Sequence, residues 1–435
     1  MPCSPYSADT SPLSTAFPIL PRIQRLVTAI LRYPSLLLLL LAAYTSVLPA
    51  QPVYDLLLKG GHVIDPANEI DRISDLAITG DQIAVVADNI PPAKAKQVVD
   101  VSGLYVTPGL IDIHAHVFGL PGSLFPDDTS LVTGATTIVD CSGSGWRTFD
   151  RFKSEIIDRV QTRVLAYLNI VGAGMVSSAA ESNTDDMDAE AAAAKVHEYP
   201  NLIVGIKKHD PGPTGFFVFK RAIETGKLAD VPVLVDDNIY TNQDRNMQDK
   251  LLDIMRPGDL HTHMYNDQQM HLVSRFGGDI RPVAWEARRR GVLFDLGHGG
   301  SSFMWPVAAK AIEHGFPPPD VISTDLHSGS VMNQVDMPNC ISKLMNLGMG
   351  LNEAIARSTV NPSRAICKFP ELGTLGRGKG ADIAVFDLEK GVFAFMDARR
   401  NKLLGKERLY CVLTVRGGKI VFDENGLSFL SWDKQ

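Results

Sequence analysis

The sequence predicts an α/β fold, a closed (β/α)8 barrel of the TIM type with a small β-sandwich domain built from both chain ends. Eight apolar, strand-like runs recur between Gly109 and Leu326, with helix-compatible segments between them. Their near-continuous apolar character suits a parallel sheet that is buried on both faces. Strand-rich stretches at 54–106 and 381–426 flank this middle part, so the two ends could pair into one separate domain.

In chain order, residues 1–50 are predicted to be a signal peptide or leader. Arg22, Arg25 and Arg32 precede an uncharged run over 35–50 that contains six consecutive leucines. This run is shorter than the ~20 residues that a membrane span requires. We therefore expect cleavage near Ala50, a mature protein without a stable membrane span, and export to the periplasm or the medium. An uncleaved amphipathic anchor is the alternative.

The remaining boundaries follow the strand pattern. We expect the N-terminal part of the β-domain over 51–107, a metal-binding barrel over 108–365 and the C-terminal part of the β-domain over 366–435. An open doubly wound sheet is the alternative for the middle region, and its first strand would be followed by a glycine-rich phosphate loop. Here the first strand, PGLIDIHAHV, ends in histidines instead, which favours the barrel.

Composition excludes several classes of protein. The 435 residues are 45% hydrophobic and 21% charged, which is ordinary for a globular protein with a large core. The formal net charge of −7 gives no electrostatic case for binding nucleic acid. The five cysteines show no C-x-x-C spacing, so neither a thiolate zinc site nor a disulfide framework is indicated.

Side chains capable of metal chemistry lie at the predicted strand ends, which is where the active site of a barrel is found. His114 and His116 end the first strand and share one face because strand side chains alternate. Zinc and similar ions accept imidazole readily. Later strands end with Lys207, Asp236, His263, His298 and Asp325. A cationic lysine would be costly beside metal ions unless it were carboxylated to a carbamate, whose two oxygens can bridge two cations.

These motifs resemble the amidohydrolase superfamily. The residues that carry the resemblance are PGLIDIHAH, Lys207 in VGIKK, His263 in LHTH and Asp325 in ISTDLH, set between two halves of a β-domain. The sequence is most similar to the dihydroorotase-like and D-aminoacylase-like branch of amidohydrolase/deacetylase metallohydrolases. The resemblance implies one metal on His114 and His116, a bridging carbamate on Lys207 and a second metal on His263. It also implies that Asp325 touches the first metal and shuttles a proton.

One position departs from the superfamily pattern. Asp236 stands where a histidine is usual, so we include it as a metal ligand with the alternative of a hydrogen-bond acceptor beside the ligands. Its oxygens add negative charge and favour harder ions. We expect two divalent ions, with zinc first and with manganese or magnesium as the alternatives that Asp236 introduces. The second site could be weak or empty. His209 and Asp237 could adjust that second site.

The predicted activity is metal-dependent hydrolysis of an amide or acyl ester of a small carboxylic acid, of the deacetylase or aminoacylase kind. A metal-bound hydroxide attacks the carbonyl and Asp325 passes the proton to the leaving atom. The residues expected to bind the small-molecule substrate are His209, His298, Gly299 and Ser301. The alternatives are a cyclic amidase of the dihydroorotase or hydantoinase kind and a non-catalytic binding protein with a degenerate metal site. The sequence leaves both a monomer and a homo-oligomer as possible states of the protein.

The other six of the eleven histidines receive no functional role from the sequence, among them His261 and His327. His261 shares the face of His263 but lies deeper in its strand, so it is predicted to be a core residue. His327 is predicted to be a surface or loop residue.

Overall fold

The computed structural model describes residues 53–434 apart from 210–214, 238–246, 268–271 and 274–277. The predicted leader therefore lies outside the described residues. Among the helices within them, none has the length and apolar character needed to cross a membrane.

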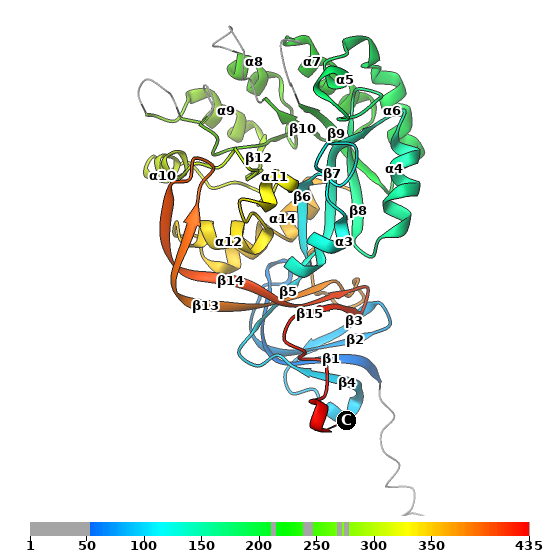
Figure 1. Ribbon diagram of the computed structural model, residues 1–435, viewed down its shortest axis with the longest axis vertical. Coiled ribbons are helices and arrows are strands. Elements are labelled where there is room, and N and C mark those ends of the chain that lie inside the picture. The colour runs from blue at the N-terminus through cyan, green and yellow to red at the C-terminus, as the bar shows by residue number, and fades with distance from the viewer. Residues whose placement is uncertain (1–52, 210–214, 238–246, 268–271, 274–277, 435) are drawn as a thin grey trace, which may run out of the picture. The chain divides into compact units, whose positions relative to one another are not determined.

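Seven parallel strands form one curved sheet in strict chain order (Figure 1). Each is almost entirely buried, as expected for strands covered on both faces. They are β6 (Leu110–Ala115), β7 (Ala135–Gly145), β8 (Arg163–Asn169), β9 (Ile203–His209), β10 (Val233–Asp236), β11 (Leu260–His261) and β12 (Leu293–Phe294).

Residues 321–326 close this sheet into a barrel. On the β12 side, Leu296 N donates a hydrogen bond to Val321 O at 3.0 Å. On the β6 side, His116 N donates to Leu326 O at 2.9 Å. Isolated parallel bridges join the segment to both edges of the sheet. It therefore takes the place of the eighth strand, and the predicted barrel is confirmed.

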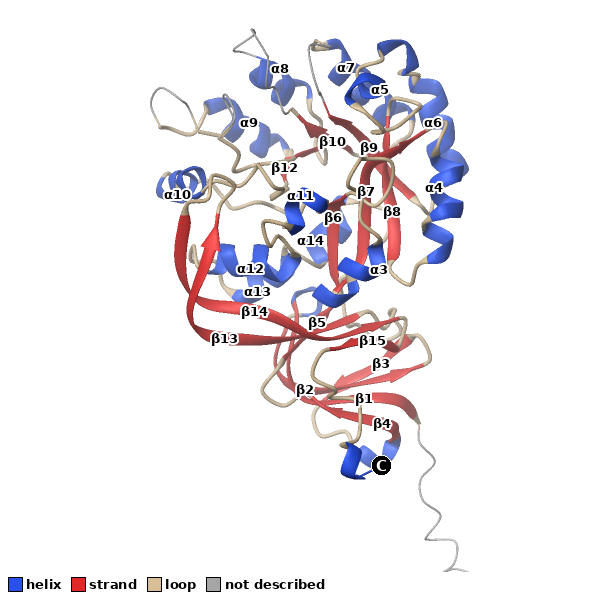
Figure 2. Ribbon diagram, viewed as in Figure 1, coloured by secondary structure: helices blue, strands red, loops and turns tan. Residues whose placement is uncertain are grey.

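Helices surround the barrel strands (Figure 2). Local sequence fixes their ends: the Asp188 carboxylate caps α6 by accepting from two backbone amides, and Gly291 ends α9 with a left-handed φ of 94°. The helices between strands are α4 (Phe149–Glu155), α6 (Ala189–Glu198), α7 (Phe217–Leu228), α8 (Met247–Ile254), α9 (Pro282–Arg290) and α10 (Trp305–Glu313). Shorter or later helices are α3 (Pro126–Thr129), α5 (Ser178–Glu181), α11 (Ser328–Val331), α12 (Met337–Met345), α13 (Leu351–Ala356) and α14 (Val360–Ala365). The 3-10 turns are η1 (Pro66–Asn68), η2 (Pro92–Lys94), η3 (Leu131–Thr133), η4 (Ile157–Arg159), η5 (Thr184–Asp186) and η6 (Trp432–Lys434).

The barrel interior is packed with apolar side chains. Alternate residues of successive strands, such as Ile111, Val139, Leu165 and Val204, form one buried cluster. Polar side chains lie further along the strands, at their carboxyl ends. The barrel has a filled centre, and its polar side chains gather at one rim.

A second, mixed sheet contains strands from both chain ends, as predicted. Its strands are β1 (Tyr54–Asp65), β2 (Ile70–Thr79), β3 (Gln82–Ala87), β4 (Ala95–Asp100), β5 (Tyr105–Pro108), β13 (Ile383–Met396), β14 (Lys402–Arg416) and β15 (Lys419–Asp423). The order is β15-β14-β13-β5-β1-β2-β3, with β4 paired to β1. The antiparallel pairing of β5 with β13 joins the two ends.

The hairpin of β13 and β14 continues beyond this sheet and runs beside α12 toward the segment that precedes α10 (Figure 1). Leu409 N in β14 donates to Ser342 Oγ in α12 at 2.9 Å. The turn at residues 397–401, which we call the hairpin tip, binds the barrel directly. Ala398 N there donates to Phe303 O at 3.0 Å. The β-domain thus reaches the rim of the barrel.

Candidate metal centre

Two groups of metal-ligand side chains lie at the carboxyl ends of the barrel strands. His114, Asp236 and His263 form one group, and His114, His116 and Asp325 form the other. Within each group the ligand atoms all lie within 4.8 Å of one another. His114 and His116 lie at the end of β6, Asp236 ends β10, His263 follows β11, and Asp325 belongs to the closing segment 321–326. The predicted strand-end positions therefore meet in space, with His114 common to both groups.

Lys207 lies beside His114, the residue common to both groups, and beside Asp236. Its Nζ is 3.0 Å from His114 Nε2 and 3.4 Å from Asp236 Oδ2, and the residue is 1% exposed. Burial opposes a positive charge here, but the nearby Cys141 and carboxylates raise the pKa of Lys207 above its ordinary value. The amine is therefore protonated when no cation occupies the centre.

The histidines differ in charge because their surroundings differ. Burial lowers the pKa of His116 to about 4 and also lowers the pKa of His114, so both rings are neutral, which is the form that binds metal. Burial acts in the same direction on His263. There the Asp236 carboxylate, 3.3 Å from His263 Nε2, outweighs burial and raises the pKa to about 9.

Asp325 is held as a carboxylate. Burial opposes its charge, but the neighbouring imidazoles, above all His114, lower its pKa. Its Oδ1 lies 3.0 Å from His116 Nε2. Asp325 and His263 also have left-handed backbones, with φ of 50° and 59°. Residues other than glycine seldom adopt this conformation, which clusters at functional sites.

The donor set fits a divalent cation. Asp236 Oδ1 and His116 Nδ1 are buried, and neither has a hydrogen-bond partner within the described part of the chain. A buried carboxylate oxygen without a donor is costly. A cation bound by Asp236 would remove that cost. Imidazole nitrogens with carboxylate oxygens form a donor set that zinc and manganese both accept.

A buried network that the sequence did not reveal orients His114. Thr262 Oγ1 lies 3.0 Å from His114 Nδ1, and Asp295 Oδ2 lies 3.3 Å from the same nitrogen. Thr262 Oγ1 also donates to Asp295 Oδ2 at 2.7 Å. A carboxylate that holds one ring nitrogen leaves the other, Nε2, to face the centre. The signal was present, because Asp295 interrupts the apolar run VLFDL and a carboxylate buried there needs partners.

Asp140, in the middle of β7, fixes the loop that follows His116. Its Oδ1 accepts from Val117 N at 2.9 Å and Phe118 N at 3.1 Å, and its Oδ2 accepts from Gly143 N at 2.8 Å. The carboxylate therefore ties the loop after β6 to the carboxyl-terminal part of β7.

We expect Asp140→Asn to flatten the pH dependence of stability. Burial raises the pKa of Asp140 to about 7, above an unfolded value near ~3.9. Folding then takes up a proton between those values, so the contribution of Asp140 to stability falls as the pH rises from about 4 to 7. Urea unfolding at pH 5 and pH 7.5 measures this. Wild type should lose more free energy of unfolding over the interval than Asp140→Asn, and parallel losses would contradict the assignment.

The predicted substrate-binding residues have different surroundings. Both ring nitrogens of His298 have protein partners, Gly299 O at 2.9 Å and Lys343 Nζ at 2.7 Å. Gly299 is buried against Asp325, whereas Ser301 is exposed. His209 is partly exposed, with its Nδ1 2.9 Å from a buried Glu181 oxygen. Burial opposes its charge, yet Asp236 and Glu181 raise the pKa of His209. The charged form of His209 is therefore favoured near Asp236.

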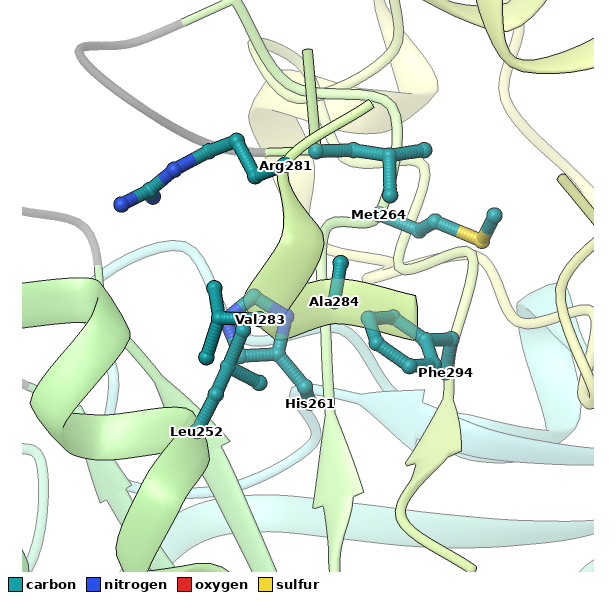
Figure 3. Close-up of a pocket in the computed structure, with 8 residues that line it drawn as sticks. Leu252, His261, Met264, Arg281, Val283, Ala284 and Phe294 are labelled. Carbon is teal, nitrogen blue, oxygen red and sulfur yellow. The ribbon is translucent and has the colours of Figure 1, made fainter. Parts of the chain in front are cut away.

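His261 faces away from the two ligand groups. Its ring lines an apolar pocket between β11 and the helices α8 and α9, next to Leu252 and Val283 (Figure 3). Its Nε2 is 3.3 Å from Asp237 Oδ1. Asp237 therefore pairs with His261 and is not part of either ligand group. The predicted core position of His261 agrees with this arrangement.

His327 lies closer to the centre than the sequence indicated. Its ring centroid is 6.0 Å from that of His116, and its Nδ1 is 3.8 Å from Asp325 Oδ1. The side chain is 28% exposed, so it sits at the mouth of the centre. His327 is a partly exposed loop residue, as predicted. Strand periodicity no longer applies after the last barrel segment, so it could not indicate that this loop approaches the centre.

Comparison with known proteins finds relatives that agree with one another in family and in the kind of reaction they are named for. The profile of the Amidohydrolase family matches residues 301–421. A deacetylase of Enterococcus faecalis is 27% identical over 379 residues, which are 84% of this chain and 99% of that protein. A deacetylase of Agrobacterium fabrum is 30% identical over 326 residues, which are 72% of this chain and 78% of that protein.

Solved structures agree with these sequence matches. The crystal structure of an adenine deaminase is 27% identical with a TM-score of 0.77 and covers 84% of this chain and 99% of its own. That of a dihydroorotase is 26% identical with a TM-score of 0.72 and covers 85% and 99%. Barrel and centre define a metal-dependent hydrolytic enzyme. The chain belongs to the amidohydrolase family.

Proposed function

We propose that this enzyme is a deacetylase that removes an acyl group from an amide or ester of a small carboxylic acid. The observation that carries the proposal is that two ligand groups share His114 and that Lys207 contacts this shared residue, because the arrangement provides for a pair of cations. The choice of acyl substrate is supported by the relatives named deacetylases, which match 72–84% of the chain. A sequence match to a dihydroorotase of Streptococcus pyogenes is 41% identical but extends over only 90 residues.

In this proposal, His114, His116 and Asp325 hold one divalent cation, and Asp236 and His263 hold the second. Zinc is the favoured ion, with manganese and magnesium as alternatives. A bound cation supplies a Lewis acid that polarises the substrate carbonyl and makes water acidic. The protein's own part is to present the neutral imidazoles of His114 and His116, exclude bulk water and move a proton.

Lys207 would serve as a carbamate. Its neutral amine attacks carbon dioxide, a nitrogen–carbon bond forms and one proton leaves. Starting from the ammonium that the raised pKa favours, two protons are released in all. The resulting carboxylate replaces a positive charge with a negative one beside Asp236 and His114. Cation uptake should therefore depend on dissolved carbon dioxide.

Asp325 would carry the proton. Its carboxylate is ionised and lies at the mouth of the centre, with 13% of the side chain exposed. It can take a proton from the attacking water and give it to the leaving nitrogen or oxygen. The positive charge on His209, held by Glu181, would attract the carboxylate of the substrate. Substrates without a carboxylate should then bind more weakly.

A cyclic amide is the second candidate substrate, because the dihydroorotase structure covers 85% of this chain. Elemental analysis of the purified protein, combined with a substrate panel, separates the two candidates. The panel should contain N-acetyl and O-acetyl carboxylic acids, dihydroorotate, a hydantoin and adenine. We expect two metal equivalents and turnover of acetyl compounds. Turnover of the cyclic amides alone would support the second candidate, and folded, metal-free, inert protein would overturn both.

We expect Asp236→His to shift metal preference toward zinc. The change replaces an anionic oxygen ligand with a neutral nitrogen, which softens the site and makes it more positive. Competitive titration of metal-free protein with zinc and manganese measures the ratio of the two affinities. Asp237→His is the matched control, since Asp237 faces His261 instead of the centre. An unchanged ratio in Asp236→His would show that Asp236 is not a ligand.

We also propose that the protein is exported after removal of residues 1–50. The arginines followed by an apolar, uncharged run support this proposal. N-terminal sequencing of purified soluble protein tests it, and an intact residue 1 would contradict it.

A further inference from the structure

The loop that follows β12 touches two of the proposed metal ligands. His263 Nδ1 donates to Gly297 O at 2.6 Å, which points the other ring nitrogen toward Asp236. The loop backbone also lies against Asp325, because a Cβ added at Gly299 would be 2.4 Å from Asp325 Oδ2. The position of residues 297–299 therefore sets the positions of both ligands.

His298, in the middle of this loop, faces away from the centre and is held on three sides. Its Nδ1 donates to Gly299 O at 2.9 Å. Its ring stacks on Phe303, with centroids 4.7 Å apart and planes inclined by 10°. Its Nε2 accepts a hydrogen bond from Lys343 Nζ at 2.7 Å. These partners fix the ring as the neutral tautomer that carries its proton on Nδ1.

Lys343 connects this loop to the other domain. It belongs to α12, is 1% exposed and also donates to Met396 O at 2.7 Å, at the end of β13. Its ammonium lies 5.3 Å from the centroid of the Phe303 ring. The adjoining hairpin tip also contacts the chain next to Phe303, because Trp305 Nε1 donates to Asn401 O at 3.1 Å. Burying a lysine ammonium costs free energy unless its N–H groups are hydrogen-bonded, and the bonds to His298 and Met396 O supply two of the partners it needs.

We propose that Lys343 is a positioning residue for the metal centre: through His298 it holds loop 297–299 against His263 and Asp325, with the β13–β14 hairpin as its anchor. The β-domain thereby contributes to the geometry of a centre whose ligands all belong to the barrel. This inference rests on the metal centre proposed above. Groups that orient metal ligands in this way typically change metal affinity or activity by about 10–100-fold when removed.

The test is the metal affinity of Lys343→Met, measured without substrate by competition between metal-free protein and a chelator for zinc. Methionine keeps most of the volume and removes both donated bonds. We expect about 10–100-fold weaker binding. Ser342→Ala is the matched control, because Ser342 is buried in the same helix and accepts from Leu409 N but does not contact His298. It should lose stability without losing metal affinity.

A double-mutant cycle with His298→Asn shows whether Lys343 acts through His298. If it does, the double variant should bind zinc about as weakly as the weaker single variant. A folded Lys343→Met protein with wild-type affinity, or fully additive losses, would overturn the inference. A wild-type protein that binds no metal would instead overturn the proposed centre.

If Lys343→Met does not fold, NMR of wild-type protein labelled with ¹⁵N-histidine tests the contact between Lys343 and His298 directly. The signals of His298, assigned with His298→Asn, should show a protonated Nδ1 and an Nε2 that accepts a hydrogen bond. A proton on Nε2 would exclude the contact with Lys343 and overturn the inference.

Discussion

Replacing Asp325 with asparagine is expected to lower kcat by roughly 10²–10⁴-fold, the usual contribution of a positioned acid–base group. Asparagine keeps the shape of the side chain but can neither take a proton nor supply a charged ligand. The neighbouring imidazoles favour the ionised carboxylate, so the loss should persist across the neutral pH range. Steady-state hydrolysis of the best acetyl substrate, together with metal content, gives the measurement.

Asp88→Asn is the control for this experiment, because Asp88 lies in the β-domain with 67% of its side chain exposed. It should keep wild-type kcat and metal content. An Asp325→Asn enzyme with more than about one tenth of wild-type kcat would remove Asp325 from the proposed proton path.

Lys207→Ala is expected to lose about 10²-fold or more of activity and a large part of the bound metal. Alanine leaves a space where the carbamate is proposed to stand between the two ligand groups. Short carboxylic acids should restore part of the activity, because their carboxylate can occupy that space. The measurement is kcat/KM and metal content as the concentration of propionate rises.

Lys208→Ala separates a carbamate from a merely buried lysine. Lys208 is equally buried, but its ammonium contacts Glu181 O on another side of β9. We expect no rescue of this variant by carboxylic acids. If neither variant responds to propionate, or if Lys207→Ala keeps its full metal content, the carbamate proposal fails.

The barrel and the positions of the ligand groups could be predicted because both follow from local sequence. Period-two alternation places His114 beside His116, and strand ends converge on one rim in any parallel barrel. Those two facts led from the sequence to the groups that the structure brings together. The same reasoning assigned the β-domain to both chain ends.

Contacts between distant elements could not be predicted in this way. Lys343 was absent from the candidate residues, since nothing in the sequence of α12 indicates a bond to His298 or to Met396 O. His298 itself was expected to meet substrate, whereas the structure uses both its nitrogens internally. Such pairings depend on tertiary packing. They leave no periodic pattern in the sequence from which they could be predicted.

The pairing of β5 with β13 has a consequence for how the molecule folds. Pro108 pairs with Ile383, so the edge of β5 stays open until nearly the whole chain has been synthesised. Contacts so distant in sequence form slowly, because a long loop must close before they contribute. Nascent chains that stop before β13 should therefore expose an unsatisfied strand edge and aggregate.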